Sequence, residues 1–167
     1  MRHLLIPALF VLATPAFAHA PAIGPNGGLR LHWGQNHYEL KPAGNVVNVY
    51  VMSAENDKPV DASKAKATGR FLIGGKLVPV TFTPAGGNRL TAPGLLTGNW
   101  QAQVVVTMPG QQPATLKFSE KQRADVAADA VHERLTAADD KIASATSDHN
   151  VFLKELGRPL LPLRNSV

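Results

Sequence analysis

The chain has no cysteine among its 167 residues. This excludes disulfide bonds, cysteine-based zinc sites and thiol chemistry, and it leaves histidine, methionine and carboxylates as candidate metal ligands. After the first residues, no apolar run approaches the roughly 20 residues that a membrane-spanning helix needs. No run of lysine or arginine is longer than two, so the formal net charge of +5 is scattered. We read this charge as favouring solubility and weak attraction to anionic surfaces rather than nucleic-acid binding.

Motifs of the common catalytic classes are also missing. The sequence has no G-x-S-x-G, no cysteine nucleophile and no glycine-rich loop that leads into a helix and could cradle a phosphate. The glycine pairs at 27–28, 74–75 and 86–87 lie in turn contexts and are interpreted as structural. We therefore predict that the protein is not an enzyme. An oxidative copper enzyme would need an open, flat copper face and a substrate, and the sequence indicates neither.

Residues 1–18 have the pattern of a secretory signal peptide, with a short positive start, an apolar stretch and an A-x-A motif at its end. A second A-x-A motif would place Pro21 directly after the cut, where proline fits poorly because the peptidase needs an extended backbone. We therefore expect cleavage after Ala18. Removing 18 of the 167 residues would leave 149, with a formal charge of +4 because one arginine leaves. This mature chain would begin at His19 and lie in the periplasm without spanning a membrane.

Residues 29–40 predict a β-hairpin, because apolar and polar residues alternate on both sides of Gly34-Gln35. A two-residue loop with glycine first suits a type II′ turn. The resulting pairs are Leu29 with Leu40, Arg30 with Glu39, Leu31 with Tyr38, His32 with His37 and Trp33 with Asn36. One face is then apolar, and the other carries an Arg-Glu pair and a His-His pair. A slip of one residue would mix these faces.

The following segments are short, rich in β-formers and separated by Gly and Pro turns, and we expect strands at 46–52, 60–67, 70–73, 76–82, 89–91, 100–108 and 114–118. Pro79 lies inside one of them and predicts an edge position or a bulge there. The fold class that this spacing predicts is mainly β. We expect residues 19–118 to form an antiparallel β-sandwich of immunoglobulin-like type, followed by a C-terminal helical extension.

The composition changes at Ser119, from which the chain has no Gly or Pro until Gly157. Ser119 to Gln122 matches a capping box, and residues 119–157 are predicted to be helical. A narrow seam of alanine and aliphatic residues should be the buried face: Ala124, Ala127, Val131, Leu135, Ala138 and Ile142. Ser147 or Asp148 is expected to cap a second short helix, with Val151, Phe152 and Leu156 as its buried contacts. Residues 158–167 are expected to form an extended tail.

The candidate metal ligands are His19, His32 and His37. Opposed residues on antiparallel strands have Cβ atoms roughly 4.5–5.5 Å apart, so His32 and His37 could share one metal ion. After cleavage His19 would offer a ring nitrogen and an α-amino group, a nitrogen pair that suits Cu(II). Pro21 lacks an N–H and disfavours wrapping of the metal by successive backbone amides.

Each candidate also has an interpretation without a metal. Paired histidines on the polar face of a sheet are often only tolerated there, and an N-terminal histidine can lack a fixed position. Met52 and Met108 are interpreted as core residues, since both lie in or beside apolar strands. His132 lacks the H-E-x-x-H spacing, and Asp148-His149 is explained by helix capping.

A signal cut that exposes His19-Ala20-Pro21 ahead of a small all-β body resembles the periplasmic copper-resistance and copper-carrier sandwiches. A second resemblance is to small sandwich modules associated with heavy-metal efflux adaptors, and the segments that carry it are Gly24–Gly28, His37–Leu40, Asn48–Val51 and Asp57–Val60. Both cover roughly residues 19–118. The copper-carrier resemblance implies ligation by the N-terminal histidine with further His and Asp residues. Only His19 matches that pattern, because Asp148-His149 lies in the extension.

The sequence is compatible with two functions. The first is a periplasmic protein that binds a metal ion, with copper as the expected cofactor, and buffers or delivers it. Its ligands would be His19, His32 and His37, with Arg30 and Glu39 beside them. The alternative is a non-catalytic envelope interaction module. It would dock a partner, such as a metal-efflux or assembly component, through its sheet edge or its C-terminal helix.

Overall fold

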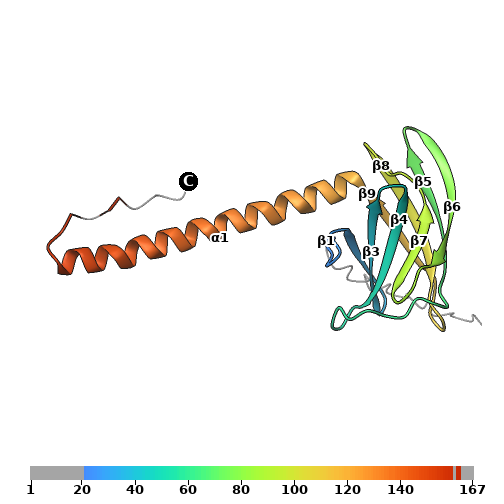
Figure 1. The fold of residues 1–167 in the computed structure, drawn as a ribbon, viewed down its shortest axis with the longest axis horizontal. Coiled ribbons are helices and arrows are strands. Elements are labelled where there is room, and N and C mark those ends of the chain that lie inside the picture. Colours follow the sequence, from blue (N-terminus) through green and yellow to red (C-terminus); the bar gives the residue numbers. More distant parts are fainter. Residues whose placement is uncertain (1–20, 160, 163–167) are drawn as a thin grey trace, which may run out of the picture.

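The computed structural model describes residues 21–159 and 161–162, apart from the side chain at position 152. Nine strands precede one long helix (Figure 1). The elements are β1 Ala22–Ile23, β2 Leu29–Trp33, β3 Asn36–Ala43, β4 Val46–Ser53, β5 Lys66–Ile73, β6 Lys76–Pro84, β7 Arg89–Pro93, β8 Trp100–Thr107, β9 Ala114–Ser119 and α1 Glu120–Glu155. The expected signal peptide and His19 lie outside the described residues.

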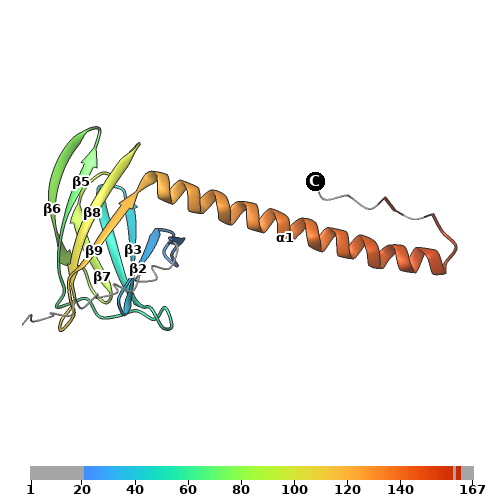
Figure 2. The same ribbon diagram turned by 180° about the vertical axis from the view of Figure 1, so that it is seen from behind.

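All strand pairs are antiparallel, and the strands are hydrogen-bonded in the order β1-β2-β3-β4-β7-β6-β5-β8-β9. The sheet curls until β2 approaches β9, as the two opposite views show (Figures 1 and 2). The predicted class, mainly antiparallel β with a C-terminal helix, is confirmed. The immunoglobulin-like sandwich is not confirmed, because the strands form one continuous curled sheet.

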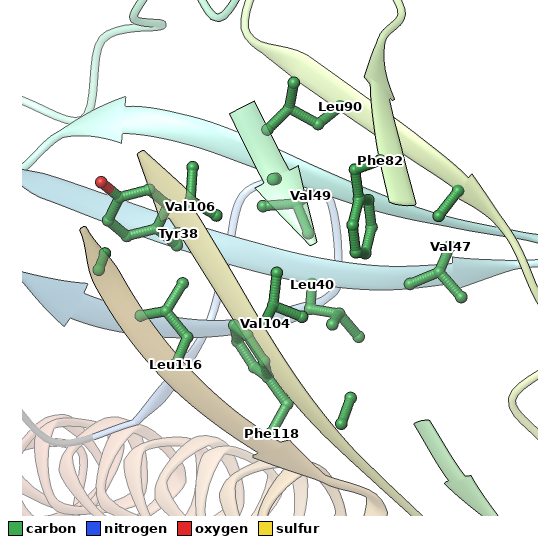
Figure 3. Packing of buried hydrophobic residues seen from close by; sticks show 14 of the residues in the cluster. Tyr38, Leu40, Val47, Val49, Phe82, Leu90, Val104, Val106, Leu116 and Phe118 are labelled. Carbon is green, nitrogen blue, oxygen red and sulfur yellow. The ribbon is translucent and has the colours of Figure 1, made fainter. Parts of the chain in front are cut away.

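The core fills the concave side of this sheet (Figure 3). Alternating residues of each strand point inward, so the period of two in the sequence becomes one apolar layer. The completely buried members include Leu29, Leu40, Val47, Val49, Val51, Phe71, Leu90, Ala92, Val104 and Val106. Phe71 and Phe82 contact each other edge to face, with ring centroids 6.1 Å apart.

The predicted hairpin register is confirmed at all five positions from Leu29↔Leu40 to Trp33↔Asn36. Gly34 has a φ of 59°, the positive value that the first position of a type II′ turn requires. The strand expected at 60–67 is wrong in its first part, since β5 begins at Lys66. Before it, the Asp61 carboxylate accepts bonds from the Ser63 N–H and hydroxyl, which stabilises a turn in competition with a strand.

Pro79 lies at a local edge, as predicted. β6 is interior in the strand order, yet it pairs with β7 only at Thr83 and Pro84. Around Pro79, which pairs with Arg70 of β5, the other side of β6 has no neighbouring strand. A proline, which cannot donate a backbone hydrogen bond, is tolerated there for that reason.

The helix begins where the capping pattern predicts. The Gln122 N–H donates to Ser119 Oγ over 3.2 Å. At the other end, Gly157 has a φ of 63°; its N–H donates to the Lys154 carbonyl, and the Arg158 N–H donates to the Leu153 carbonyl. These two bonds form a Schellman motif, which ends the helix.

The second helix expected from Ser147 or Asp148 is wrong, because α1 continues without a break for 36 residues. No Gly or Pro interrupts the backbone ladder there, and a residue that could cap a helix does not end one that can continue. The Thr146 hydroxyl bonds back to the Ile142 carbonyl, which uses its capping capacity inside the helix.

The predicted buried face of the helix is also wrong for most of its length. Only the start of α1 contacts the sheet, near β1 and β9, and there Val126 packs against the core. Beyond it α1 projects into the open for several turns (Figures 1 and 2). Side chains expected to be buried are 56% to 61% exposed: Val131, Leu135, Ile142, Val151 and Leu156. Amphipathic spacing predicts that a face will be covered, but it does not say by which chain.

Replacing Phe71 by alanine tests the core. Phe71 is completely buried and contacts Phe82, so we expect Phe71→Ala to lower the free energy of unfolding by about 3–5 kcal/mol. Leu77→Ala is the matched control, because Leu77 is 61% exposed on β6 and its loss should change stability by less than about 0.5 kcal/mol. Urea denaturation followed by tryptophan fluorescence measures both, and equal effects would contradict the assigned core.

Candidate functional site

The polar face of the β2–β3 hairpin brings the two central candidate ligands together. His32 and His37 are cross-strand partners, with ring centroids 5.3 Å apart and ring planes at 69°. His37 is buried on β3, between β2 and β4, and His32 is half-buried. The predicted His-His pair is thus present in the structure.

Asp57 joins this pair from a different part of the chain. Its carboxylate lies 2.6 Å from His37 Nδ1 and accepts a bond from Arg30 Nη1 at 2.9 Å. The turn after β4 places it there, since the Asp57 N–H donates to the Ser53 carbonyl and the Ser53 N–H donates to the Lys58 carbonyl. Asp57 has a φ of 55°, a left-handed conformation that aspartate tolerates better than most residues.

Sequence reasoning missed Asp57 as a site residue. The signal that could have found it is the Asn56-Asp57 turn at the end of β4, because β4 pairs with β3 and places His37 opposite Met52. The polar turn that begins just after Met52 therefore lies next to His37. The β3–β4 register is needed for this inference, and the sequence alone did not supply it.

The hydrogen bond with His37 holds the pKa of Asp57 below its ordinary value of 3.8, against the opposing effect of desolvation and with help from the Arg30 charge. Asp57 is therefore a carboxylate at neutral pH and acts as an acceptor. It fixes His37 with the proton on Nδ1, so that Nε2 is the nitrogen that would face a metal ion. A carboxylate in this position is the usual outer partner of a metal-binding histidine.

Glu39 has a different role from the one expected. It stands opposite Arg30 in the register, but Arg30 bonds to Asp57, and Glu39 turns away and is completely buried. Its carboxylate accepts hydrogen bonds from the Asn26 N–H at 3.1 Å, Asn26 Nδ2 at 2.9 Å and the Gly28 N–H at 2.6 Å. The expectation that Glu39 lies beside a metal as the partner of Arg30 is corrected, because a buried carboxylate takes the donors that satisfy it best.

Two glycines allow the loop before β2 to close over Glu39. A Cβ atom on Gly24 would lie 2.3 Å from Glu39 Cδ, and one on Gly28 would lie 2.4 Å from the Leu40 carbonyl oxygen. Both distances exclude any side chain without rearrangement. The loop is closed by two backbone bonds, from the Gly24 N–H to the Gly28 carbonyl and from the Gly27 N–H to the Gly24 carbonyl. It holds β1 against β2.

The direction of β1 bears on His19, which lies outside the described residues. Ala22 pairs with Arg30 and Ile23 with Leu29, so the N-terminal end of β1 lies toward the end of β2 that carries His32. His19 is three residues before Ala22, a reach of at most roughly 10 Å. Within residues 21–159 and 161–162 no group of three or more His, Asp or Glu side chains is arranged to hold a metal ion.

The other candidates have ordinary positions. Met52 and Met108 are buried, as their interpretation as core residues predicts. His132, Asp148 and His149 are exposed on α1, away from the hairpin.

A shallow hollow on β5, β6 and β8 has one charged side chain in its lining, Arg70, together with residues such as Thr68, Thr81 and Gln103. It offers no pair of titratable groups. The hairpin face therefore remains the candidate site.

The sequence matches no family model and no curated protein. Among solved structures, a DUF4426 family protein from Pseudomonas aeruginosa PAO1 is similar, with 20% sequence identity and a TM-score of 0.41. The match covers 55% of this chain and 93% of the other. We draw neither fold nor function from a likeness at this level. No helix in the described part of the chain is long and apolar enough to cross a membrane.

Replacing Glu39 by glutamine tests the loop closure. Glutamine keeps the size but offers one oxygen in place of a charged acceptor, and its amide nitrogen would face backbone N–H donors. We expect Glu39→Gln to lower the free energy of unfolding by about 2 kcal/mol. The matched control is Glu55→Gln, at an exposed position, which should be nearly neutral. Urea denaturation measures both, and an effect of Glu39→Gln no larger than the control would contradict the assigned role.

The Asp57 contacts predict a pH dependence. A carboxylate with a pKa lowered by folding stabilises the native state above its unfolded pKa, near 3.8, and this contribution disappears as pH falls through the folded pKa. Asp57→Asn should therefore reduce stability at pH 7 and pH 5, and the difference from wild type should shrink below pH 3.8. Thermal denaturation at pH 7, 5, 3 and 2 measures it, with the exposed Asp140→Asn as control. A difference that is constant over this range would refute the assignment.

Proposed function

We propose that this protein is a periplasmic metal-binding protein that buffers or delivers a metal ion, with copper as the expected ion and His19, His32 and His37 as its ligands. The observation that carries the proposal is the facing pair His32 and His37, one of which is oriented by a carboxylate. This arrangement supplies two imidazoles on one face of a rigid hairpin, with the ring of His37 preset by Asp57.

The third ligand is proposed from the processing of the chain. Cleavage after Ala18 would give His19 an α-amino group beside its imidazole, and nitrogen ligands suit Cu(II) best in the divalent series. The loop on Glu39 supports this step, because it holds β1 antiparallel to β2 with Ala22 opposite Arg30, two residues from His32. In this proposal Arg30 and Asp57 lie beside the metal ligands. Glu39 does not, and it instead fixes the loop between β1 and β2.

The chemistry of this ligand set favours exchange over permanent storage. The set would offer four nitrogen donors, three imidazoles and the α-amino group of His19. Two of the four would belong to the chain terminus, so a competing protein could displace them before the two hairpin histidines. A carrier needs such a stepwise release, and no catalytic group is required for it.

A second candidate function is an envelope interaction module without a metal, which would dock an efflux or assembly partner. The exposed outer part of α1 favours it, since a helix packed on the sheet would have offered no such surface. The exposed Leu77 and Val78 on the bare part of β6 offer a sheet edge for the same purpose.

Titration of the processed protein with Cu(II), against a chromophoric competitor, tests the metal proposal. We expect His32→Ala/His37→Ala to lower affinity at least roughly 10-fold, and Asp57→Asn to lower it by about 10-fold through loss of ring orientation. His132→Ala/His149→Ala is the matched control, because it removes two exposed histidines of α1 and should leave affinity unchanged.

A second variant tests whether the α-amino group of His19 contributes to metal binding. Adding Gly-Ser before His19 moves the α-amino group away and should weaken binding while the hairpin pair still contributes. Unchanged affinity in the His32→Ala/His37→Ala variant would remove the hairpin from any metal site. If the folded wild-type protein binds no copper, the metal proposal fails and the interaction module remains.

A further inference from the structure

The outer part of α1 carries a seven-residue repeat that nothing else in the chain uses. From Ala124 onward, residues at alternating spacings of four and three follow one seam along the helix. In heptad terms, the a positions include Ala128, Leu135, Ile142, His149 and Leu156, and the d positions include Ala124, Val131, Ala138 and Ala145. A strict seven-residue repeat of this length is the pattern of a coiled coil rather than of a helix on a sheet.

This seam is uncovered within the described chain. Val131, Leu135, Ile142 and Leu156 are all more than half exposed. Among the described residues after the helix, Leu161 is held away from the seam by two hydrogen bonds to the Asn150 side chain. Position 150 is a b position, roughly 130° around the helix from the middle of the seam.

The charged residues beside the seam identify what would cover it. The g positions are basic in the first half, at Arg134 and Lys141, and acidic in the second, at Asp148 and Glu155. Within α1 none of them has an oppositely charged residue three or four positions away; Arg158 follows Glu155 by three, just past the helix end. Within the described chain none of the four forms an ion pair. Two acidic groups near a helix C-terminus are also unfavourable for an isolated helix.

We propose that α1 pairs with α1 of a second copy of this chain as an antiparallel two-stranded coiled coil. In an antiparallel pair, g positions face g positions of the partner. One register places Lys141 against Asp148 of the second copy and Arg134 against its Glu155. By the two-fold axis each pair occurs twice, so all four unpaired charges of each helix are matched.

The same register fits the seam residues. Ile142 faces Ala145 of the second copy, Ala138 faces its His149, and Val131 faces its Leu156. The layers of Ile142 with Ala145 and of Ala138 with His149 set a large side chain against a small one, and the Val131–Leu156 layer pairs two large apolar side chains.

A parallel, in-register dimer fits worse. It would put Ala138 against Ala138 and Ala145 against Ala145, with little apolar contact in two layers. Two His149 rings would meet at one a position, and Lys141 would face Thr146 instead of an acid. Only the antiparallel arrangement uses the reversal of charge along the g positions.

The length of the helix leaves room for the pair. α1 has 36 residues, about 54 Å, and the second copy's Leu156 would lie beside Val131. Eleven residues, about 16 Å, separate Val131 from the start of the helix at the sheet. Figures 1 and 2 show the outer part of the helix standing clear of the strands from both sides. The two sheets would lie at opposite ends of the paired helices.

Charge reversal tests the register. The full chain, as its host cell processes it, should be a dimer by light scattering coupled to size-exclusion chromatography at tens of micromolar and moderate salt. Lys141→Glu or Asp148→Lys alone should raise the dimer dissociation constant by about 10-fold or more, because each puts like charges together. The double variant should recover most of the loss. Lys154→Glu and Asp140→Lys, at f positions outside the seam, are the matched controls and should change it little.

Cysteine cross-linking tests the direction of pairing, since the chain has no cysteine of its own. A mixture of Val131→Cys and Leu156→Cys proteins should form a mixed disulfide dimer, whereas neither variant alone should cross-link. Cross-linking of Leu156→Cys with itself would establish a parallel pair and overturn the proposal.

A folded monomer at these concentrations would overturn it as well, and so would a dimer that Lys141→Glu leaves intact. A helix covered instead by a different protein would appear as a monomer alone and a complex only with that protein. Ile142→Lys is the control for folding. It should abolish the dimer but leave the sheet folded, so the resulting monomer should unfold at the same urea concentration as the wild type.

Discussion

The buried carboxylate of Glu39 is the interaction on which the arrangement of the candidate site depends. A fully buried charge must be met by donors, and here the loop before β2 supplies three of them. Because that loop is closed by its own backbone bonds, satisfying Glu39 also sets where β1 lies against β2. The N-terminal end of β1 thereby lies toward the end of β2 that carries His32, although Glu39 touches neither histidine. Arg30, which would otherwise pair with Glu39, is left to bond Asp57.

The parts of the structure that could be predicted from sequence are those in which neighbours in sequence are also neighbours in space. The β2–β3 register follows from alternation across a two-residue turn, and so do the opposed His32 and His37. The start of α1 at Ser119 and its end at Gly157 follow from local backbone chemistry in the same way. The parts that failed depend on distant contacts. Asp57 reaches His37 from 20 residues away, and the Glu39 donors come from a loop whose conformation the pattern does not specify.

For α1, the sequence predicts an apolar face but not the surface against which that face packs, because apolar spacing does not identify the element that covers it. The spacing of four and three is nonetheless that of a helix meeting another helix, and the sheet meets only its first turns. The seam and the unpaired charges at its side point to the same covering element, which lies outside the single chain. In the proposed dimer the two sheets would lie at opposite ends of the paired helices, so the two β2–β3 hairpins would be held at a fixed separation.

The half-bare strand β6 has a consequence for how such molecules behave when crowded. Leu77 and Val78 expose apolar surface on an edge that lacks a neighbour, which is a template for uncontrolled pairing of one sheet with the next. Pro79 stands in the middle of that edge and removes one donor, so an incoming strand cannot build an unbroken ladder along it. Lys76 at the start of the strand adds charge to the same edge. The β body is thereby protected from polymerising through this strand.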